Sequence, residues 1–526
     1  MMDFPLTLPA IFRHAERVFP RREIVTRNAD KSFHRYTYAD FAVRTRRLAG
    51  ALRSLGVRPG DRVATLAWNH HRHLEAYFGV SMTGAVLHTL NLRLHPDDLC
   101  FIVNDADDRV VLVDETLLPL WEKIAPRANV EKVIAFGDEY ERLLAAASPC
   151  GDDSDFDERT AAAMCYTTGT TGTPKGVLYS HRSLVLHTFA ICMPSGMGLS
   201  EADAILPVVP MFHANAWGLP YAAVMTGAKL VMPGPHLDAT SLLDLFVQER
   251  VTFTAGVPTI WMSVLQQLDA NPGAYDLSSL RAMFVGGAAV PQALIEAFEK
   301  RHGLKLVHAW GMTETTPLGT VSYLPLDLAA AAEEEQYQIR AKQGRPVAFV
   351  EIRARNENGL VPNDGQTMGE LEIRGPWIAA GYFNRTDCGD RFTDDGWFKT
   401  GDIVTIDDRW FVTIQDRAKD LIKSGGEWIS SIALENIAVG HPAVSEAAVI
   451  GVRHAKWGER PLLIVVKRPG VELTRDAMLG FYAGKIANWW LPDDVIFVDE
   501  LPHTATGKLS KLTLRQQFSD YQLRTG

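Results

Sequence analysis

The chain has 526 residues, of which 47% are hydrophobic and 22% are charged, and its mean hydropathy of −0.04 is close to zero. This composition is typical of globular proteins and excludes fibrous and intrinsically disordered classes. The formal net charge of −10 disfavours sequence-independent nucleic-acid binding, which depends on clustered Lys and Arg, so we expect small-molecule chemistry and no nucleic-acid partner.

The N-terminal residues 1–23 carry charged side chains where a signal peptide would need an apolar stretch. No later run reaches the ~20 apolar residues that span a bilayer. We therefore expect a cytoplasmic protein without a transmembrane segment. The five cysteines are odd in number and scattered, which indicates neither a disulfide framework nor a zinc site.

Helix and strand patterns alternate along the first part of the chain. Apolar residues recur at helical spacing over residues 38–55 and 73–87, and strand patterns follow each of them, at 62–68 and 109–115. Further short strands rich in apolar residues are predicted at 132–137, 228–234, 251–258 and 281–291. This alternation predicts a layered α/β fold.

The pattern changes twice in the second half of the chain. Closely spaced strands separated by Gly, Asn and Asp predict a β-rich subdomain over 350–414. A polar stretch follows, and the order then becomes helix, strand, strand, helix, strand, helix. These elements extend over about a hundred residues, which is the size of a small α+β domain. We place the boundary near Lys419, with a large N-terminal domain over 1–418 and a small C-terminal domain over 419–526. Two domains are expected because single cores stop growing at about 250 to 300 residues.

The stretch "YTTGTTGTPKGVLYSH" (166–181) is rich in Gly and Thr. A Walker-type loop needs GxxxxGK followed by Ser or Thr, and here the lysine follows a proline, so that motif is absent. Backbone N–H groups freed by glycine, threonine hydroxyls and one positive charge suit a polyphosphate that must be gripped and then released. The residues concerned are Thr167, Thr168, Gly169, Thr170, Thr171 and Lys175.

This stretch resembles the phosphate-loop motif of the adenylate-forming superfamily, which comprises acyl-CoA synthetases, luciferases and the adenylation domains of peptide synthetases. Its other motifs follow in order along nearly the whole chain. They are "WGMTET" (310–315), "KTGD" (399–402), "DRAKDLIKSGGEWIS" (416–430) and "PHTATGKLSK" (502–511). The resemblance implies that a carboxylate attacks ATP to form an acyl-adenylate, a reaction governed by positioning and charge neutralisation.

The resemblance also implies a nucleotide site. Glu314 is expected to hold Mg²⁺ with Thr167, and Trp310 to form a wall for adenine, where the family usually has tyrosine. Asp402 and Arg417 are expected at the ribose hydroxyls. The remaining ATP contacts implied are Gly287 and Ala288 beside the adenine, Gly311, Met312, Thr313 and Lys419.

Lys508 is the strongest catalytic candidate, because it can place a positive charge between the substrate carboxylate and the α-phosphate. Lys511 is close but lies outside the core of the motif. In family members the C-terminal domain rotates between the two steps, so the resemblance implies a mobile domain with its hinge at Lys419. Gly425 and Gly426 would then approach the channel for the thiol.

Two segments resemble those of fatty acyl-CoA synthetases, namely "PMFHANAWGLPYA" (210–222) and "GGEWIS" (425–430). They imply that Trp428 gates an apolar acyl tunnel, that Trp217 faces it and that His213 lies at its carboxylate end. The expected function is an ATP-dependent, AMP-forming ligase of medium- or long-chain fatty acids and CoA. A short, branched, thioether or aryl acid is the alternative substrate.

Other classes share the adenylation step. A peptide-synthetase adenylation domain would normally be followed by a carrier domain, and the chain ends soon after Lys508, which favours free CoA as the acceptor. A luciferase-like oxygenase stays open and is testable by light emission. A non-catalytic relative would be expected to lack Lys508, Glu314 or Asp402, and all three are present. The resemblance also implies a homodimer.

Overall fold

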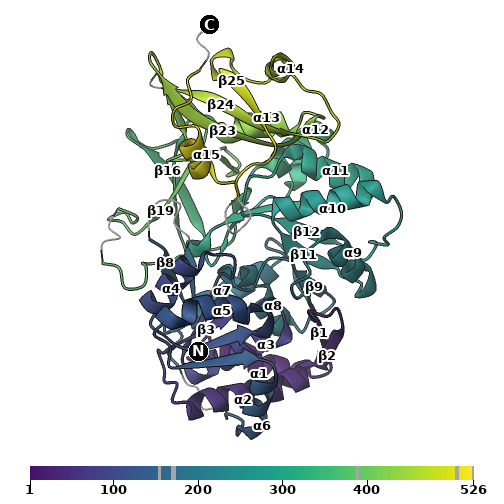
Figure 1. Cartoon of the computed structure of the whole chain (residues 1–526), viewed down its shortest axis with the longest axis vertical. Coiled ribbons are helices and arrows are strands. Elements are labelled where there is room, and N and C mark those ends of the chain that lie inside the picture. The colour runs from purple at the N-terminus through teal and green to yellow at the C-terminus, as the bar shows by residue number, and fades with distance from the viewer. Residues whose placement is uncertain (152–155, 168–172, 387–389, 426, 504–508, 524–526) are drawn as a thin grey trace.

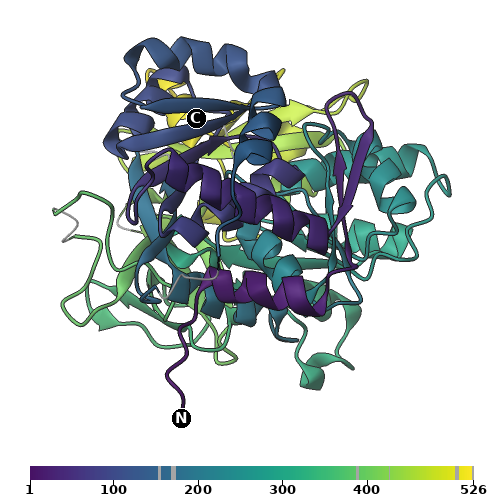
Figure 2. The ribbon, with the colours of Figure 1, turned by 90° about the horizontal axis from the view of Figure 1, so that it is seen from below.

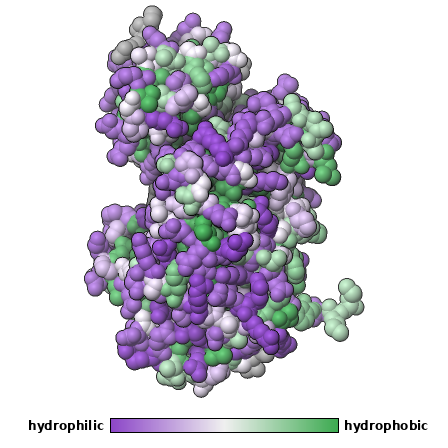
Figure 3. Space-filling model, turned by 90° about the vertical axis from the view of Figure 1, so that its right-hand side faces the viewer, coloured by the Kyte–Doolittle hydropathy of each residue, from purple (hydrophilic) through white to green (hydrophobic). Residues whose placement is uncertain are grey.

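The computed structural model describes residues 1–151, 156–167, 173–386, 390–425, 427–503 and 509–523. Figure 1 shows a large body at the bottom and centre and a smaller C-terminal part at the top. In Figure 3 the molecule narrows between these parts, and in Figure 2 the N-terminal end of the chain extends away from the body.

The first sheet is built mainly of parallel strands in the order β6, β5, β3, β4, β7, with β8 antiparallel at one edge. Its central strands are Val- and Leu-rich and buried, as expected for a parallel sheet covered by helices. Its strands are β3 (Arg62–Leu66), β4 (Val86–Thr89), β5 (Asp108–Asp114), β6 (Lys132–Phe136), β7 (Ala161–Thr167) and β8 (Lys175–Ser180). The helices of this region are α2 (Tyr38–Ser54), α3 (His71–Gly79), α4 (Pro96–Asp105), α5 (Leu118–Ile124), α6 (Asp138–Ala146) and α7 (His181–Cys192).

The second sheet runs in the order β15, β14, β13, β12, β11, β9, β10, β1, β2, and its strands from β13 to β1 are parallel. They are β1 (Glu23–Arg27), β2 (Phe33–Thr37), β9 (Ala204–Pro207), β10 (Lys229–Met232), β11 (Phe253–Gly256), β12 (Ala282–Val285), β13 (Leu306–Gly311), β14 (Leu318–Val321) and β15 (Arg345–Pro346). Its helices are α1 (Leu8–Val18), α8 (Leu219–Thr226), α9 (Ala239–Gln248), α10 (Pro258–Ala270), α11 (Gln292–His302) and α12 (Glu333–Ala341).

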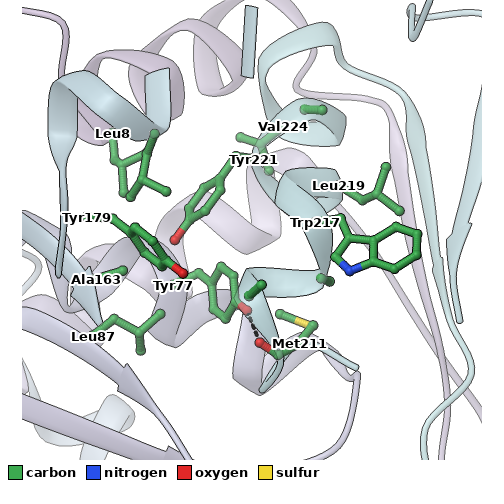
Figure 4. Packing of buried hydrophobic residues seen from close by; sticks show 14 of the residues in the cluster. Leu8, Tyr77, Leu87, Ala163, Tyr179, Met211, Trp217, Leu219, Tyr221 and Val224 are labelled. Carbon is green, nitrogen blue, oxygen red and sulfur yellow. Dashed lines mark hydrogen bonds between the residues drawn. The ribbon is translucent and has the colours of Figure 1, made fainter. Parts of the chain in front are cut away.

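The main core joins these two sheets. Leu87 of β4 and Leu230 of β10 belong to the same buried cluster, together with aromatic side chains of α1, α3 and α8. Helices α1 and α2 lie side by side in Figure 2. Figure 4 shows Tyr77 and Tyr221 inside this cluster, with the Tyr77 hydroxyl donating to the carbonyl of Met211.

The third sheet is antiparallel, in the order β17, β16, β18, β19, β20. Its strands are β16 (Glu351–Asn356), β17 (Gly359–Leu360), β18 (Gly369–Arg374), β19 (Phe398–Ile406) and β20 (Val412–Arg417). The C-terminal part carries the fourth sheet and has its own core. It contains β21 (Ile422–Ser424), β22 (Glu427–Ile429), α13 (Ser431–Val439), β23 (Val444–His454), β24 (Gly458–Lys467), α14 (Arg475–Gly480), β25 (Asp494–Val498) and α15 (Lys511–Gln517).

The predicted α/β architecture, with a β-rich subdomain and a small α+β C-terminal part, is confirmed. The boundary predicted near Lys419 falls between the end of β20 at Arg417 and the start of β21 at Ile422. Among the described residues, no helix is both long and apolar enough to cross a membrane.

Helix α2 begins as its sequence predicts, because Thr37 caps it and forms a reciprocal capping box with Asp40. The helix predicted over 73–87 is wrong in its second half. Helix α3 ends at Gly79, and Gly84 has a φ of +77°, a conformation that suits glycine and ends the helical turns. The following residues then enter the first sheet as β4, parallel to β3.

Candidate functional site

A cavity of about 860 Å³ opens beyond the carboxyl ends of β7, β11, β12 and β13, where ligands bind in α/β sheets. Residues of the C-terminal part, among them Glu435 and Lys511, also line it. The sequence-predicted site residues that line this cavity are Thr167, Lys175, His213, Trp217, Gly287, Ala288, Trp310, Gly311, Met312, Thr313, Glu314, Asp402, Arg417 and Lys419. Residues from three sheets thus meet around one space.

Asp402 is held by two donors, Arg417, which was predicted at the same ribose, and Trp310, which was predicted at the adenine. Its Oδ1 pairs with Nε of Arg417 at 2.8 Å, and its Oδ2 accepts a hydrogen bond from Nε1 of Trp310 at 3.1 Å. The antiparallel register of β19 and β20 places Asp402 opposite Arg417. Only 2% of Asp402 and 8% of Trp310 are exposed, so water cannot easily replace either bond. Where the family usually has tyrosine, the Trp310 indole therefore supplies its Nε1–H as a hydrogen-bond donor to Asp402.

Glycines let the backbone and the Trp310 ring approach closely. A Cβ at Gly319 would stand 2.6 Å from Cζ3 of Trp310, and one at Gly286 would stand 2.6 Å from the carbonyl oxygen of Ala309. A Cβ at Gly311 would stand only 1.6 Å from the carbonyl oxygen of Pro317. A side chain at any of these positions would collide with the Trp310 ring or the backbone and would displace the flat wall on which an adenine ring could lie.

Glu314 is buried in the cavity wall and is in contact with Tyr382. The Tyr382 hydroxyl donates to Oε1 of Glu314 at 2.7 Å, and the Lys175 ammonium lies 5.1 Å from the centre of the Tyr382 ring. Burial and the negative charge of Glu314 raise the pKa of Tyr382 above its usual range, so this hydroxyl keeps its proton and donates. Tyr382 also lines the cavity.

The strands that flank the phosphate loop are antiparallel neighbours, with Thr167 of β7 opposite Lys175 of β8. The Thr167 hydroxyl donates to the Lys175 carbonyl at 3.4 Å. Both residues line the cavity. The loop residues between them that we predicted to grip phosphate, Thr168, Gly169, Thr170 and Thr171, lie outside the described residues.

A metal site made by protein alone is not found in the described part of the chain, where no group of three or more His, Cys, Asp or Glu side chains could hold an ion. Mg²⁺ does not need such a group, since it is usually bound by one or two carboxylates, waters and substrate phosphates. The buried Glu314 carboxylate and the Thr167 hydroxyl present oxygen atoms of the kind that Mg²⁺ prefers on the wall of the cavity. These residues therefore fit Mg²⁺ bound together with a polyphosphate.

The segment around Trp217 has an unusual backbone. Residues 214–217 (Ala, Asn, Ala, Trp) have φ values between +42° and +56°, followed by Gly218 at +78°. Such a left-handed turn costs roughly 1–2 kcal/mol for each residue that is not glycine. Buried contacts hold it, including the Cys165 thiol, which lies 3.3 Å from Oδ1 of Asn215. In Figure 4 the Trp217 ring is turned away from Tyr77 and Tyr221. Strain of this kind gathers at functional sites.

The C-terminal part contributes a buried charged pair to the cavity. Nζ of Lys511 lies 2.8 Å from Oε1 of Glu435 and also donates to the Ser431 hydroxyl. The Ser431 hydroxyl in turn donates to Asp416 of β20, so the contacts join the two domains. Burial raises the pKa of Glu435. Burial opposes the charge of Lys511, but the carboxylates of Glu435 and Asp416 outweigh it and raise its pKa.

Lys508 lies outside the described residues. The residues on either side of its segment, His503 and Leu509, pair as an isolated β-bridge and line the cavity. The chain on both sides of the predicted catalytic lysine is therefore at the cavity.

Of the "GGEW" segment, the described residues Gly425 and Trp428 do not line this cavity. Trp428 is half-buried on β22, opposite Lys423 of β21, and is not among the described residues that line the cavity. Gly425 instead borders a second hollow of about 470 Å³, lined also by Ser424, Trp457, Arg460 and Trp489. Gly426 lies outside the described residues. The structure therefore brings Trp217 and His213 to the residues predicted to bind the nucleotide but does not bring Trp428 to them.

Sequence reasoning missed Tyr382, Gly319 and Glu435. Tyr382 follows β18 in the stretch "GYFN", and no spacing connects it to Glu314, which precedes it by 68 residues. Gly319 follows the "WGMTET" motif, and nothing in the sequence shows that the Trp310 ring packs on it. Glu435 was detectable only as an acid on a predicted helix.

Comparison with known proteins extends the likeness over the whole chain. The model of the AMP-binding enzyme family matches residues 12–383, and that of the AMP-binding enzyme C-terminal domain matches residues 433–508. The long-chain-fatty-acid–CoA ligase of Thermus thermophilus is 47% identical over 528 residues, covering 99% of this chain and 97% of that protein. The 3-methylmercaptopropionyl-CoA ligase of Ruegeria pomeroyi is also 47% identical, and the match covers 99% of this chain and 98% of that protein.

A solved structure gives the same result in three dimensions. ATP-bound MatB from Rhodopseudomonas palustris is 26% identical and superposes with a TM-score of 0.86, over 98% of this chain and 99% of that chain. The two sequences differ at most positions, yet the arrangement of both domains is shared.

Proposed function

Because the chain belongs to the AMP-binding enzyme family, we propose that it is an ATP-dependent, AMP-forming ligase of fatty acids and CoA that prefers medium- to long-chain acids. The observation that carries this proposal is the shared cavity. The nucleotide residues Trp310, Asp402 and Glu314 line the same space as His213 and Trp217 of the acyl segment. A carboxylate and an α-phosphate can therefore meet there.

In the first step an oxygen of the fatty-acid carboxylate attacks the α-phosphorus of ATP. The bond from that phosphorus to the β-phosphate oxygen breaks, and pyrophosphate leaves with the electron pair. Asp402 and Arg417 orient the ribose, and the ring of Trp310 forms the wall for adenine. Lys175 and Lys508 supply positive charge to the phosphates and to the meeting carboxylate. Because both reactants are anions, this charge lowers the barrier.

Glu314 and Thr167 are the residues that would hold Mg²⁺. The bound ion would neutralise phosphate charge and stabilise the leaving pyrophosphate. The buried position of Glu314 and its hydrogen bond to Tyr382 keep the carboxylate at one place in the wall. Burial also strengthens its attraction for a cation.

In the second step the CoA sulfur attacks the acyl carbon of the acyl-adenylate, its proton is released and AMP leaves. We propose that the C-terminal domain turns about Lys419 between the steps, so that Gly425 and Gly426 reach the thiol channel. The second hollow supports this reading, because Trp457 and Trp489, both partly exposed, offer aromatic faces to a nucleotide tail.

For the acyl chain we propose a tunnel that begins at His213 and Trp217, with Trp428 as its gate. In the observed arrangement Trp428 stands away from the cavity, so the gate would form only when the domain turns. A short thioether acid is the second candidate substrate, because the Ruegeria relative named for it is as similar as the Thermus relative.

We further propose a cytoplasmic homodimer, on the resemblance to the family. Size-exclusion chromatography with light scattering would test the dimer.

The experiment that tests the function is pyrophosphate release from ATP across a panel of acids, from acetate to long-chain fatty acids, with thioether and aryl acids. Each acid is measured with and without CoA. A maximum at medium or long chains, with turnover that needs CoA, supports the proposal. Release that favours methylthiopropionate would select the second candidate, and light without CoA-dependent turnover would favour the oxygenase class.

Lys508→Ala tests the catalytic lysine. We expect loss of adenylation, while thioester formation from supplied acyl-adenylate and CoA continues. The control is Lys123→Ala on the exposed surface of α5, which should leave both half-reactions unchanged. Equal loss of both half-reactions in Lys508→Ala would refute the role.

A further inference from the structure

Tyr382 touches two groups that the proposed function uses, although no motif connects it to them. Its hydroxyl donates to Oε1 of Glu314 at 2.7 Å, and its ring lies under the Lys175 ammonium, 5.1 Å from ring centre to nitrogen. Only 8% of Tyr382 is exposed. One buried side chain thus contacts both the carboxylate expected to bind the metal and the ammonium expected to bind phosphate.

The chain around Tyr382 is tied to both strands that flank the phosphate loop. The N–H of Phe383 donates to the carbonyl of Gly176 in β8 at 2.8 Å. Arg385 pairs with Asp105 at 3.0 Å, and Asp105 also accepts the hydroxyl of Tyr166 in β7 at 2.7 Å. The position of Tyr382 is therefore set by the same strands that carry Thr167 and Lys175.

This arrangement restricts the Glu314 carboxylate. A carboxylate on a free side chain rotates about its last bond, and binding a cation must then stop that rotation. The hydrogen bond from Tyr382 holds Oε1 in place and so fixes the direction in which the remaining lone pairs of the carboxylate face a cation. Groups that orient a metal ligand through a hydrogen bond typically change metal affinity by 10- to 100-fold when they are lost.

We propose that Tyr382 is a positioning residue of the nucleotide site, which orients Glu314 toward the metal through its hydroxyl and supports Lys175 at the phosphates through its ring. This inference rests on the proposed function. Substitution can distinguish the two contributions, because phenylalanine removes only the hydroxyl whereas leucine removes both the hydroxyl and the ring.

The test measures nucleotide binding without turnover. Calorimetry with α,β-methylene-ATP, in the absence of acid and CoA, gives the affinity without metal and the Mg²⁺ concentration at half-maximal enhancement. For Tyr382→Phe we expect the Mg²⁺ requirement to rise by about tenfold, with the metal-free affinity unchanged. For Tyr382→Leu we expect the same rise and, in addition, metal-free binding weaker by about threefold, because Lys175 loses the ring.

The matched control is Tyr140→Phe. The Tyr140 hydroxyl also donates at 2.7 Å to a buried glutamate, Glu75, and neither residue lines the cavity. It should cost stability without changing the Mg²⁺ requirement. An unchanged Mg²⁺ requirement in Tyr382→Phe, or an equal rise in Tyr140→Phe, would overturn the inference. If the unsubstituted protein itself fails to bind the nucleotide with Mg²⁺, the proposed function fails instead, so the two failures are distinguishable.

Discussion

The hydrogen bond from Trp310 to Asp402 should be measurable as nucleotide affinity. Trp310→Phe keeps an aromatic wall for adenine but removes the Nε1 donor, 3.1 Å from Oδ2 of Asp402. Hydrogen bonds to charged groups contribute about 1.5–3 kcal/mol. Arg417 still pairs with the other oxygen, so we expect the lower half of that range. At about 1.4 kcal/mol per factor of ten, the Kd for AMP should rise by about 10- to 40-fold.

Isothermal titration calorimetry with AMP is the assay, and Trp261→Phe is its control. Trp261 also loses a buried indole hydrogen bond, to the carbonyl of Phe284 at 3.0 Å, but it does not line the cavity. The double variant Trp310→Phe with Asp402→Asn should bind AMP no more weakly than Asp402→Asn alone, because the indole acts through that carboxylate. A Kd for Trp310→Phe within twofold of the unsubstituted protein would refute the reasoning, as would full additivity in the double variant.

Three further changes test the structure around the site. Gly311→Ala should abolish AMP binding in calorimetry, because its Cβ would stand 1.6 Å from the Pro317 carbonyl oxygen; retained binding would contradict the close packing. Lys511→Met should cost about 3–5 kcal/mol in urea unfolding of the C-terminal domain, because it leaves Glu435 buried and unpaired, and adding Glu435→Leu should recover most of the loss. Burial lowers the pKa of His187 to about 3, so the unfolded chain takes up its proton near pH 6.5 and the folded chain does not. Stability should therefore be complete above about pH 6.5 and fall by up to about 1.4 kcal/mol per pH unit below it. The melting temperature should thus drop between pH 7 and 5, and less in His187→Gln; an equal drop in both would contradict this assignment.

Local patterns along the chain predicted most of the architecture. Three features depend only on neighbours close in sequence, so they could be predicted without the structure. They are the alternation of helices and Val-rich strands, the Gly and Asn turns after residue 350, and the change of pattern near Lys419. Asp402 and Arg417 belong to adjacent strands of one hairpin, which explains why motifs that are close in sequence also predicted partners close in space.

Contacts between distant segments were decided only by the tertiary structure. Helix α3 ends at Gly79 because the chain must return to the first sheet as β4. The left-handed turn before Gly218 persists because buried contacts offset its backbone strain, and no propensity of Ala or Trp predicts it. Tyr382 reaches Glu314 across 68 residues because two sheets meet there. The sequence by itself determined which chemical groups are present and in what order, whereas packing among the sheets decided which of them touch.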